Sequence, residues 1–405
     1  MIHHSANDMT LSFVMRNYNS CNLLKDLHEK LIIKDEPKSD YSVNIKKKWW
    51  YNDIDKINSK ILDKNDAIYL YNCDIITDKI NTMKRELSVI SKIYFAMKAN
   101  NNKDLLYTIA NECIGFECVS INEIEYLRDD LKIESDILFT TNFCNISEYE
   151  IAFNYSNVQV IVDNIDIIKK YIDVFKNKEI GLRIDLDSGE GHHISVITEG
   201  EKAKFGNKID VIKSNKQFFI NNNIKIVGLH SHRGSGIHNY ESWYNTACKL
   251  LSLASHFSTI EWIDLGGGFG VDEGKKIDFN KLNKLLYDIK TNINFYIEPG
   301  RFIVSDAGIL VCKVNQIKKK ENFNYIGLST GMNSLIRPSL YGSYHKVHNI
   351  SKINKVRDKD YNLVGPICES GDIIASNRLL PETEENDIII IENCGAYGHT
   401  MSSNY

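Results

Sequence analysis

The stretch KIYFAMK, residues 92–98, decides the fold. Residues 94–97 form an unbroken apolar run, which is typical of a parallel strand buried on both faces. The run ends in Lys98, and lysine is almost never fully buried without a partner. Lys98 therefore either emerges at the surface or enters a polar site, and this stretch alone favours the surface.

Seven further runs of the same kind follow along the chain. Stretches between them, such as FNKLNKLLYDIK (279–290), have the spacing of amphipathic helices. Strand and helix alternating eight times is the pattern of a (β/α)8 TIM barrel, an α/β fold. The seven runs are GFECVS (115–120), DILFTT (136–141), VQVIVD (158–163), IGLRID (180–185), IKIVGLHSH (224–232), IEWIDLGGG (260–268) and FYIEPGR (295–301).

Each of the eight runs ends in a polar or glycine-rich segment. In a TIM barrel the working residues stand at the carboxyl ends of the strands, so we expect these endings to meet at one face. The endings are Lys98, Glu117, Asn142, Asp163, Asp185, His232, the glycines at 266–268 and the segment 298–301.

The pattern changes near residue 307, where strand-like runs follow one another without long helices between them. GILVCKVNQIKKK (308–320) and DIIIIENCG (387–395) are two such runs. They predict a mostly antiparallel β domain. The expected organisation is an N-terminal extension (1–65), the barrel (66–306) and the β domain (307–405).

Composition excludes several classes of partner. The net charge is −4, so neither nucleic acid nor an anionic membrane is an expected partner. No apolar run reaches the roughly 18 residues of a membrane span, and the N-terminus has no signal-peptide core. The nine cysteines are scattered without a C-x-x-C pair, which indicates reduced thiols, a cytoplasmic location and no metal site.

The strand endings combine into one chemical pattern. A lysine at a barrel mouth is partly desolvated, so we expect Lys98 to lose its proton more easily than a surface lysine and to form Schiff bases with carbonyls. The glycines of DLGGGFG (264–270), with Ser235 and Arg301, can hold a phosphate, although glycine clusters also serve tight turns. Glu298 can pair with a ring nitrogen. Together these groups suit pyridoxal phosphate.

The distal part of the chain adds two candidates. Arg337, in TGMNSLIRPSLYG (330–342), precedes a proline and stands on an irregular segment. Cys368, in GPICESGD (365–372), lies beside an acid and glycines. It is therefore a better candidate for a reactive thiol than Cys118 or Cys144. A charged loop is the alternative interpretation of Arg337, and a turn is the alternative interpretation of residues 395–397 in NCGAYG (393–398).

These motifs give the chain a specific resemblance. It resembles the fold-type III pyridoxal-phosphate-dependent decarboxylases, which have an alanine-racemase-like barrel, and within them the diaminopimelate decarboxylase family. Residues 23–32 and 46–57 are similar to the segment before the decarboxylase half of bifunctional aspartate kinase/diaminopimelate decarboxylases. The matching motifs, in order, are YFAMKAN, GFECVS, HSHRGSGI, DLGGGFG, EPGR, TGMNSLIRPSLYG, GPICESGD and GAYGHTMSSNY.

The resemblance implies roles for individual residues. Lys98 would hold the cofactor covalently, His232 would stack on its ring, and Glu298 would bind the pyridine nitrogen. Cys368 would donate a proton and would enter the site with Glu369 from a partner subunit, in a homodimer with shared sites. The phosphate would be surrounded by Ser235, Gly267, Gly268, Gly300 and Arg301. The substrate would be held by Arg301, Arg337, Tyr341, Glu369 and Tyr397, of which Tyr397 would also contact the cofactor.

The expected reaction is decarboxylation of meso-2,6-diaminopimelate to L-lysine and carbon dioxide. A bidentate guanidinium suits the distal carboxylate of this substrate, and Arg337 supplies one. Three alternatives stay open: a decarboxylase of ornithine, arginine or carboxynorspermidine, an inactive relative that binds the cofactor, and a metal-dependent hydrolase using HSH (230–232) and GHH (191–193). The family continues past the last motif, so the β domain is expected to be truncated at Tyr405.

Overall fold

The computed structural model describes residues 2–4, 11–13, 45–62, 67–191, 193, 197–200, 203–271 and 275–405. The chain divides into two units, Met1–Ile57 and Asn58–Tyr405. In the first unit, β1 (Ile2–His4) pairs antiparallel with β2 (Leu11–Phe13). Most of the predicted N-terminal extension, including residues 23–32, lies outside the described residues.

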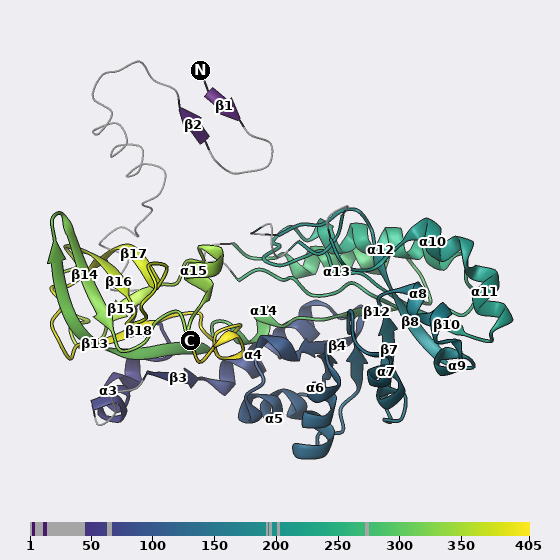
Figure 1. Ribbon diagram of the computed structural model, residues 1–405, viewed down its shortest axis with the longest axis horizontal. Helices are drawn as coiled ribbons and strands as arrows, with labels where there is room; N and C mark the ends of the chain where they lie inside the picture. Colours follow the sequence, from purple (N-terminus) through teal and green to yellow (C-terminus); the bar gives the residue numbers. More distant parts are fainter. Residues whose placement is uncertain are drawn as a thin grey trace. The chain divides into compact units, whose positions relative to one another are not determined.

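The second unit contains the predicted barrel (Figure 1). Eight parallel strands coincide with the eight predicted runs, and the pairing of β12 with β4 closes the ring. A short strand, β9 (Asn207–Lys208), is added beside β8. The eight strands are β4 (Ile90–Ala96), β5 (Gly115–Cys118), β6 (Ile137–Phe139), β7 (Val158–Val162), β8 (Glu179–Asp185), β10 (Lys225–His230), β11 (Trp262–Asp264) and β12 (Asn294–Ile297).

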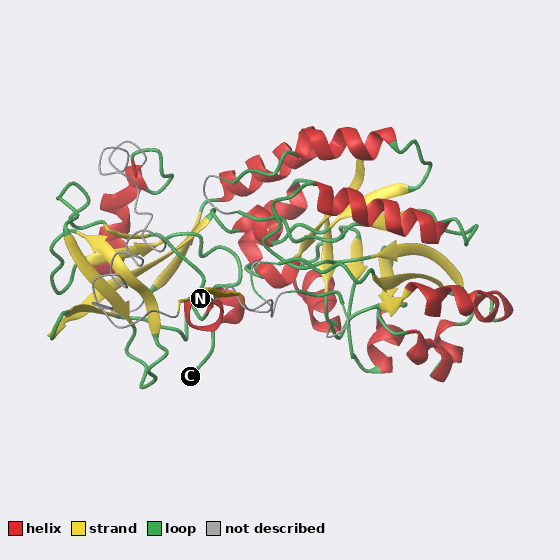
Figure 2. Ribbon diagram, turned by 90° about the horizontal axis from the view of Figure 1, so that it is seen from above, coloured by secondary structure: helices red, strands yellow, loops and turns green. Residues whose placement is uncertain are grey.

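Helices surround the strands of the barrel (Figure 2). Four of them begin at an asparagine whose side chain accepts a hydrogen bond from the backbone two residues on: Asn72, Asn102, Asn145 and Asn164. Such caps satisfy backbone donors that the helix leaves open, so they fix where each helix starts. The helices are α4 (Cys73–Glu86), α5 (Lys103–Asn111), α6 (Ile121–Glu125), α7 (Ile146–Ala152), α8 (Ile165–Lys170), α9 (Ile172–Phe175), α10 (Ile209–Ser214), α11 (Lys216–Asn221), α12 (Glu241–Ala254), α13 (Phe279–Asp288) and α14 (Arg301–Val304).

Aromatic side chains fill the barrel interior. Trp262 of β11 stacks on Tyr296 of β12, with ring centroids 5.3 Å apart. Gly228 makes room for the tryptophan, because a Cβ atom at that position would lie 2.1 Å from the Trp262 ring. The interior is therefore a packed core, and the chemistry is left to the strand ends.

The β domain is mostly antiparallel, as predicted; only β14 and β16 pair in parallel within it. A short helix, α15 (Arg337–Tyr341), precedes β15. The strand order is β15 (Val347–Asn349), β18 (Ile388–Ile391), β13 (Gly308–Lys320), β14 (Phe323–Leu328), β16 (Lys359–Val364) and β17 (Ile373–Leu380).

A strand near the start of the range predicted for the barrel belongs to the sheet of the β domain. Residues 66–71 were assigned to the barrel, but β3 (Ile68–Tyr71) pairs antiparallel with β13, where Tyr71 is opposite Gly308. The partners are more than 200 residues apart, and β3 is half-buried throughout, so it has no periodic signal of its own. Among the described residues, no helix has the length and apolar character needed to cross a membrane.

Candidate active site

Lys98 lies at the centre of the polar face. It belongs to the 3-10 turn η2 (Met97–Ala99) directly after β4, and its Nζ lies 2.6 Å from Oε2 of Glu117 at the end of β5. Burial alone would lower the pKa of Lys98, but the carboxylates of Glu117 and Glu298 outweigh it and raise that pKa above its ordinary value. The expectation that the amine loses its proton more easily is therefore wrong for the protein by itself.

Glu117 is the residue that keeps Lys98 charged. It is almost fully buried, and its second oxygen accepts a hydrogen bond from Thr140 after β6. A buried carboxylate is stable only when paired, and the lysine and the hydroxyl provide that pairing. Glu117 and Thr140 both stand at the carboxyl ends of barrel strands, and this position in the sequence pattern is the signal that places them in the site.

Glu298 follows β12 and is buried beside His230 and Asp264, the last residues of β10 and β11. Its Oε2 lies 3.4 Å from Nε2 of His230. Burial opposes ionisation, but His230 and Lys98 outweigh it and lower the pKa of Glu298. Burial and the neighbouring Glu298 raise the pKa of Asp264.

His232 presents an uncharged ring. Its Nδ1 accepts a hydrogen bond from the Gly267 amide at 3.1 Å. Burial, followed by repulsion from Lys98 and Arg183, lowers its pKa to about 3. Gly266, at φ +68°, allows this approach, because a Cβ there would lie 2.7 Å from the Ser231 carbonyl oxygen.

Arg301, Ser235 and Tyr397 form one corner of the site. Nε and Nη2 of Arg301 each lie 3.4 Å from Oγ of Ser235, and the guanidinium lies 4.8 Å from the centroid of the Tyr397 ring. The backbone N–H of Tyr397 donates to the Ala99 carbonyl, next to Lys98, at 2.9 Å. Gly300 caps α14, and Gly268 has φ +88° and approaches the Gly234 carbonyl.

Arg337 is buried without a carboxylate partner among the described residues. It is 8% exposed, and its Nη1 and Nη2 lie 3.4 Å from His345 Nε2 and 3.3 Å from Ser343 Oγ. Its Nε has no hydrogen-bond partner in the described part of the chain. Burial and the nearby charge of Arg301 lower the pKa of Arg337 to about 10. A buried cation held only by neutral groups can bind an anion strongly.

Cys368 and Glu369 lie in the loop between β16 and β17, and both are exposed. The buried carboxylate of Asp372 organises this loop by accepting the amides of Met332 and Ile367, at 2.6 and 2.9 Å. Within the described residues, no hydrogen bond or ion pair joins Cys368 or Glu369 to the barrel. Their predicted roles remain predictions that depend on a second chain.

Tyr341 and the histidine motifs complete the predicted set. The Tyr341 ring lies 5.6 Å from that of His193, whereas His192 is outside the described residues. The HSH and GHH motifs do not converge as a pair in the described part: His193 contacts Tyr341, and His232 contacts Gly267. His230, Asp264 and Glu298, by contrast, lie close together, with one polar atom of each within 4.8 Å of the others.

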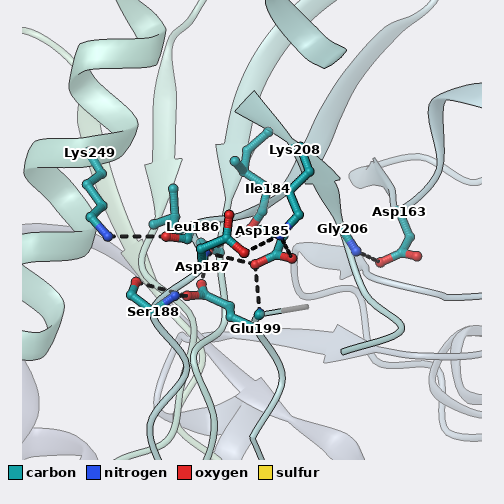
Figure 3. Close-up of polar contacts among 12 residues, drawn as sticks. Asp163, Ile184, Asp185, Leu186, Asp187, Ser188, Glu199, Gly206, Lys208 and Lys249 are labelled. Atoms are coloured by element: carbon teal, nitrogen blue, oxygen red, sulfur yellow. Dashed lines mark hydrogen bonds and ion pairs between the residues drawn. The ribbon is translucent and has the colours of Figure 1, made fainter. Parts of the chain in front are cut away.

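The segment after β8 borders the site and is held by two buried acids: Asp185, one of the predicted strand endings, and Glu199, which was not predicted (Figure 3). Asp185 accepts the amides of Asp187 and Gly200 and pairs with Lys208 at 2.7 Å. Glu199 accepts the Ser188 amide and hydroxyl. Two hydrogen bonds therefore tie this segment to Asp185 at the end of β8, and two more join its two ends to each other.

Comparisons with known proteins agree with this geometry. Residues 73–305 match the family described as pyridoxal-dependent decarboxylase, pyridoxal binding domain. The diaminopimelate decarboxylase of Archaeoglobus fulgidus is 30% identical over 86% of this chain and 87% of its own length. That of Buchnera aphidicola subsp. Baizongia pistaciae is 32% identical over 89% and 90%. The structure of Helicobacter pylori diaminopimelate decarboxylase complexed with L-lysine has a TM-score of 0.79 at 27% identity, covering 86% of this chain and 91% of that chain.

Proposed function

Because the chain belongs to the diaminopimelate decarboxylase family of pyridoxal-dependent decarboxylases, we propose that it converts meso-2,6-diaminopimelate to L-lysine and carbon dioxide. Pyridoxal phosphate is the cofactor of the reaction. The substrate is a small amino acid with a second carboxylate at its distal end. The observation that carries the substrate assignment is the buried guanidinium of Arg337, which has no carboxylate partner in the part of the chain that the structure describes.

The residues present fit the cofactor. The amine of Lys98 provides an attachment point, the neutral ring of His232 provides a flat surface, and the carboxylate of Glu298 provides a partner for a ring nitrogen. Arg301 and Ser235 converge where a phosphate would need a cation and a hydroxyl. When bound, pyridoxal phosphate supplies an electron sink for the electron pair of the broken Cα–carboxylate bond.

The chain's own side chains set the charges around the cofactor and hold the proton of Lys98. Glu117 holds the Lys98 ammonium at the mouth of the barrel, so a proton is stored at Nζ until the amine is needed. Glu298 keeps one negative charge that would stabilise a protonated ring nitrogen of the cofactor. Arg301 and Tyr397, which contact each other, would lie beside the phosphate of the cofactor.

Arg337 would fix the far end of the substrate. Its Nε is unpartnered among the described residues, and its other nitrogens contact only a histidine and a serine. A carboxylate could pair with this fork through two hydrogen bonds, whereas the cationic end of ornithine or lysine would be repelled by it. The distal carboxylate of diaminopimelate is therefore the favoured occupant.

We further infer a cytoplasmic homodimer with shared sites. Cys368 and Glu369 are exposed on a well-organised loop of the β domain and have no polar contact with the barrel among the described residues. A partner subunit would bring this loop to the other chain's Lys98, with Cys368 as the proton donor to Cα. Sedimentation and mixing of Lys98→Ala with Cys368→Ala chains tests this proposal, since only shared sites restore activity in the mixture.

The decisive experiment measures carbon dioxide released from meso-2,6-diaminopimelate by protein loaded with pyridoxal phosphate. Lys98→Ala should abolish release. Lys92→Ala, a change near the start of β4, the strand that leads to Lys98, should leave the release intact. Ornithine, lysine and arginine are assayed in parallel. Release from one of these substrates and none from diaminopimelate would overturn the substrate assignment.

A further inference from the structure

Three buried titratable groups meet at the ends of neighbouring strands. His230 ends β10 and is paired in register with Asp264, which ends β11; Glu298 follows β12. They are 1%, 0% and 4% exposed. One oxygen of each carboxylate and one ring nitrogen of His230 all lie within 4.8 Å of one another.

The hydrogen bonds of this group are incomplete. Oδ1 of Asp264 accepts the Gly266 amide at 2.7 Å, but its Oδ2 has no partner among the described residues. Oε1 of Glu298 likewise has no hydrogen-bond partner there, and neither ring nitrogen of His230 makes a well-directed hydrogen bond, although its Nε2 lies 3.4 Å from Oε2 of Glu298. Unpaired acceptors at this depth are costly, and a proton on one carboxylate supplies a donor for them.

Two carboxylates this close in a dry interior cannot both ionise, so they titrate as a pair that holds one proton. We propose that Asp264 and Glu298 share one proton, that this proton resides on Asp264, and that Asp264 and His230 thereby hold Glu298 as the anion that would pair with the cofactor's ring nitrogen. The last part rests on the proposed function, whereas the sharing of the proton does not.

The surroundings decide which oxygen carries the proton. Lys98 after β4, Arg183 in β8, His230 at the end of β10 and His232 just after it face the pair, together with the acid Glu117 from β5 and the phenol of Tyr94. The basic groups favour Glu298, since His230 Nε2 is 3.4 Å from its Oε2. Within the described part of the chain, the carboxylate of Asp264 accepts a hydrogen bond only from the Gly266 amide, and it lies against the negative charge of Glu298. Asp264 and His230 are therefore positioning residues.

Infrared spectroscopy of the cofactor-free protein at pH 8 tests the proton directly. We expect a protonated carboxyl band that shifts when aspartate, but not glutamate, carries carbon-13 in its side chain; this comparison needs no variant. Asp264→Asn should lose the band. Asp163→Asn is the matched control, because Asp163 is a buried strand-end aspartate with Arg183 Nε 3.8 Å away, and it should keep the band. A band that moves only with glutamate labelling, persists in Asp264→Asn or is missing altogether overturns the proposal.

Cofactor affinity, measured by equilibrium dialysis, tests the positioning role. Asn mimics a protonated Asp, so Asp264→Asn should bind pyridoxal phosphate within about threefold of the wild type, whereas Glu298→Gln should bind roughly 10- to 100-fold more weakly. Equal losses in the two variants would show that Asp264 acts as an anion and would overturn the assignment. If the wild type binds no cofactor, the proposed function fails while the infrared result stands by itself.

Discussion

Replacing Arg337 by methionine should make the cofactor-free protein more stable and should lower the catalytic efficiency of the enzyme. The guanidinium is 8% exposed, and its pKa falls from 12.5 to about 10 because of burial and the charge of Arg301. That shift corresponds to roughly 3 kcal/mol by which the folded state disfavours the charged group at neutral pH. The contacts with His345 and Ser343 offset part of this cost, so we expect Arg337→Met to raise the free energy of unfolding by about 1–2 kcal/mol.

The same change should damage catalysis. Removing the desolvated guanidinium that pairs with the substrate carboxylate should cost about 2–5 kcal/mol of binding free energy. This corresponds to a fall in kcat/KM of roughly 30-fold to several thousand-fold for meso-2,6-diaminopimelate. Arg337→Lys keeps the charge but lacks the planar fork of the guanidinium. Its kcat/KM should therefore lie between that of the wild type and that of Arg337→Met. Most of the loss should appear as weaker binding if the contact is already made in the ground state.

Urea unfolding and steady-state kinetics measure the two effects on the same preparations. Arg85→Met is the matched control, because Arg85 is an exposed arginine of α4 and both quantities should stay unchanged. Arg337→Met with unaltered kcat/KM would refute the role in substrate binding. A less stable Arg337→Met would refute the idea that the free enzyme holds an uncompensated charge ready for an anion.

Three further predictions concern the scaffold. Asn207→Ala should lower the free energy of unfolding by about 2–4 kcal/mol, measured in urea, because the Asn207 side chain bonds three backbone groups of the barrel that would be left unsatisfied. Gly228→Ala should destabilise by about 1–3 kcal/mol in the same assay, since its Cβ would lie 2.1 Å from the Trp262 ring. Burial raises the pKa of Glu123 from 4.5 to about 7, so the unfolded chain ionises first and stability falls as pH rises through that window. Glu123→Gln should therefore match the wild type at pH 4 and exceed it by about 1–3 kcal/mol at pH 8, still accepting the Val119 amide; equal stability at pH 8 would contradict the assignment.

Much of the fold could be predicted because its signals are local. A parallel strand covered on both faces needs a short continuous apolar run, and each of the eight runs is the barrel strand that the structure contains. The phase of the polar endings then placed Lys98, His232 and Glu298 at one face, since parallel strands end on the same side.

The pairings across the barrel and between the two sheets could not be predicted in this way. Ile68–Tyr71 joins β13, a strand that begins more than 200 residues later, and a half-buried run of four residues carries no mark of its partner. The charge on Lys98 is another case. Its pKa depends on Glu117, which is 19 residues away and becomes a neighbour only when β4 and β5 pair.

By itself, the sequence determined the eight strands, the polar edge at their ends and the residue types gathered there, because these follow from the period and polarity of short stretches. Only the tertiary structure decided how those groups act on one another. It put Glu117 against Lys98, left Arg337 buried without a carboxylate among the described residues, and set Asp264 beside Glu298. Charge states depend on distance and on exclusion from water, and both arise only when the chain is folded.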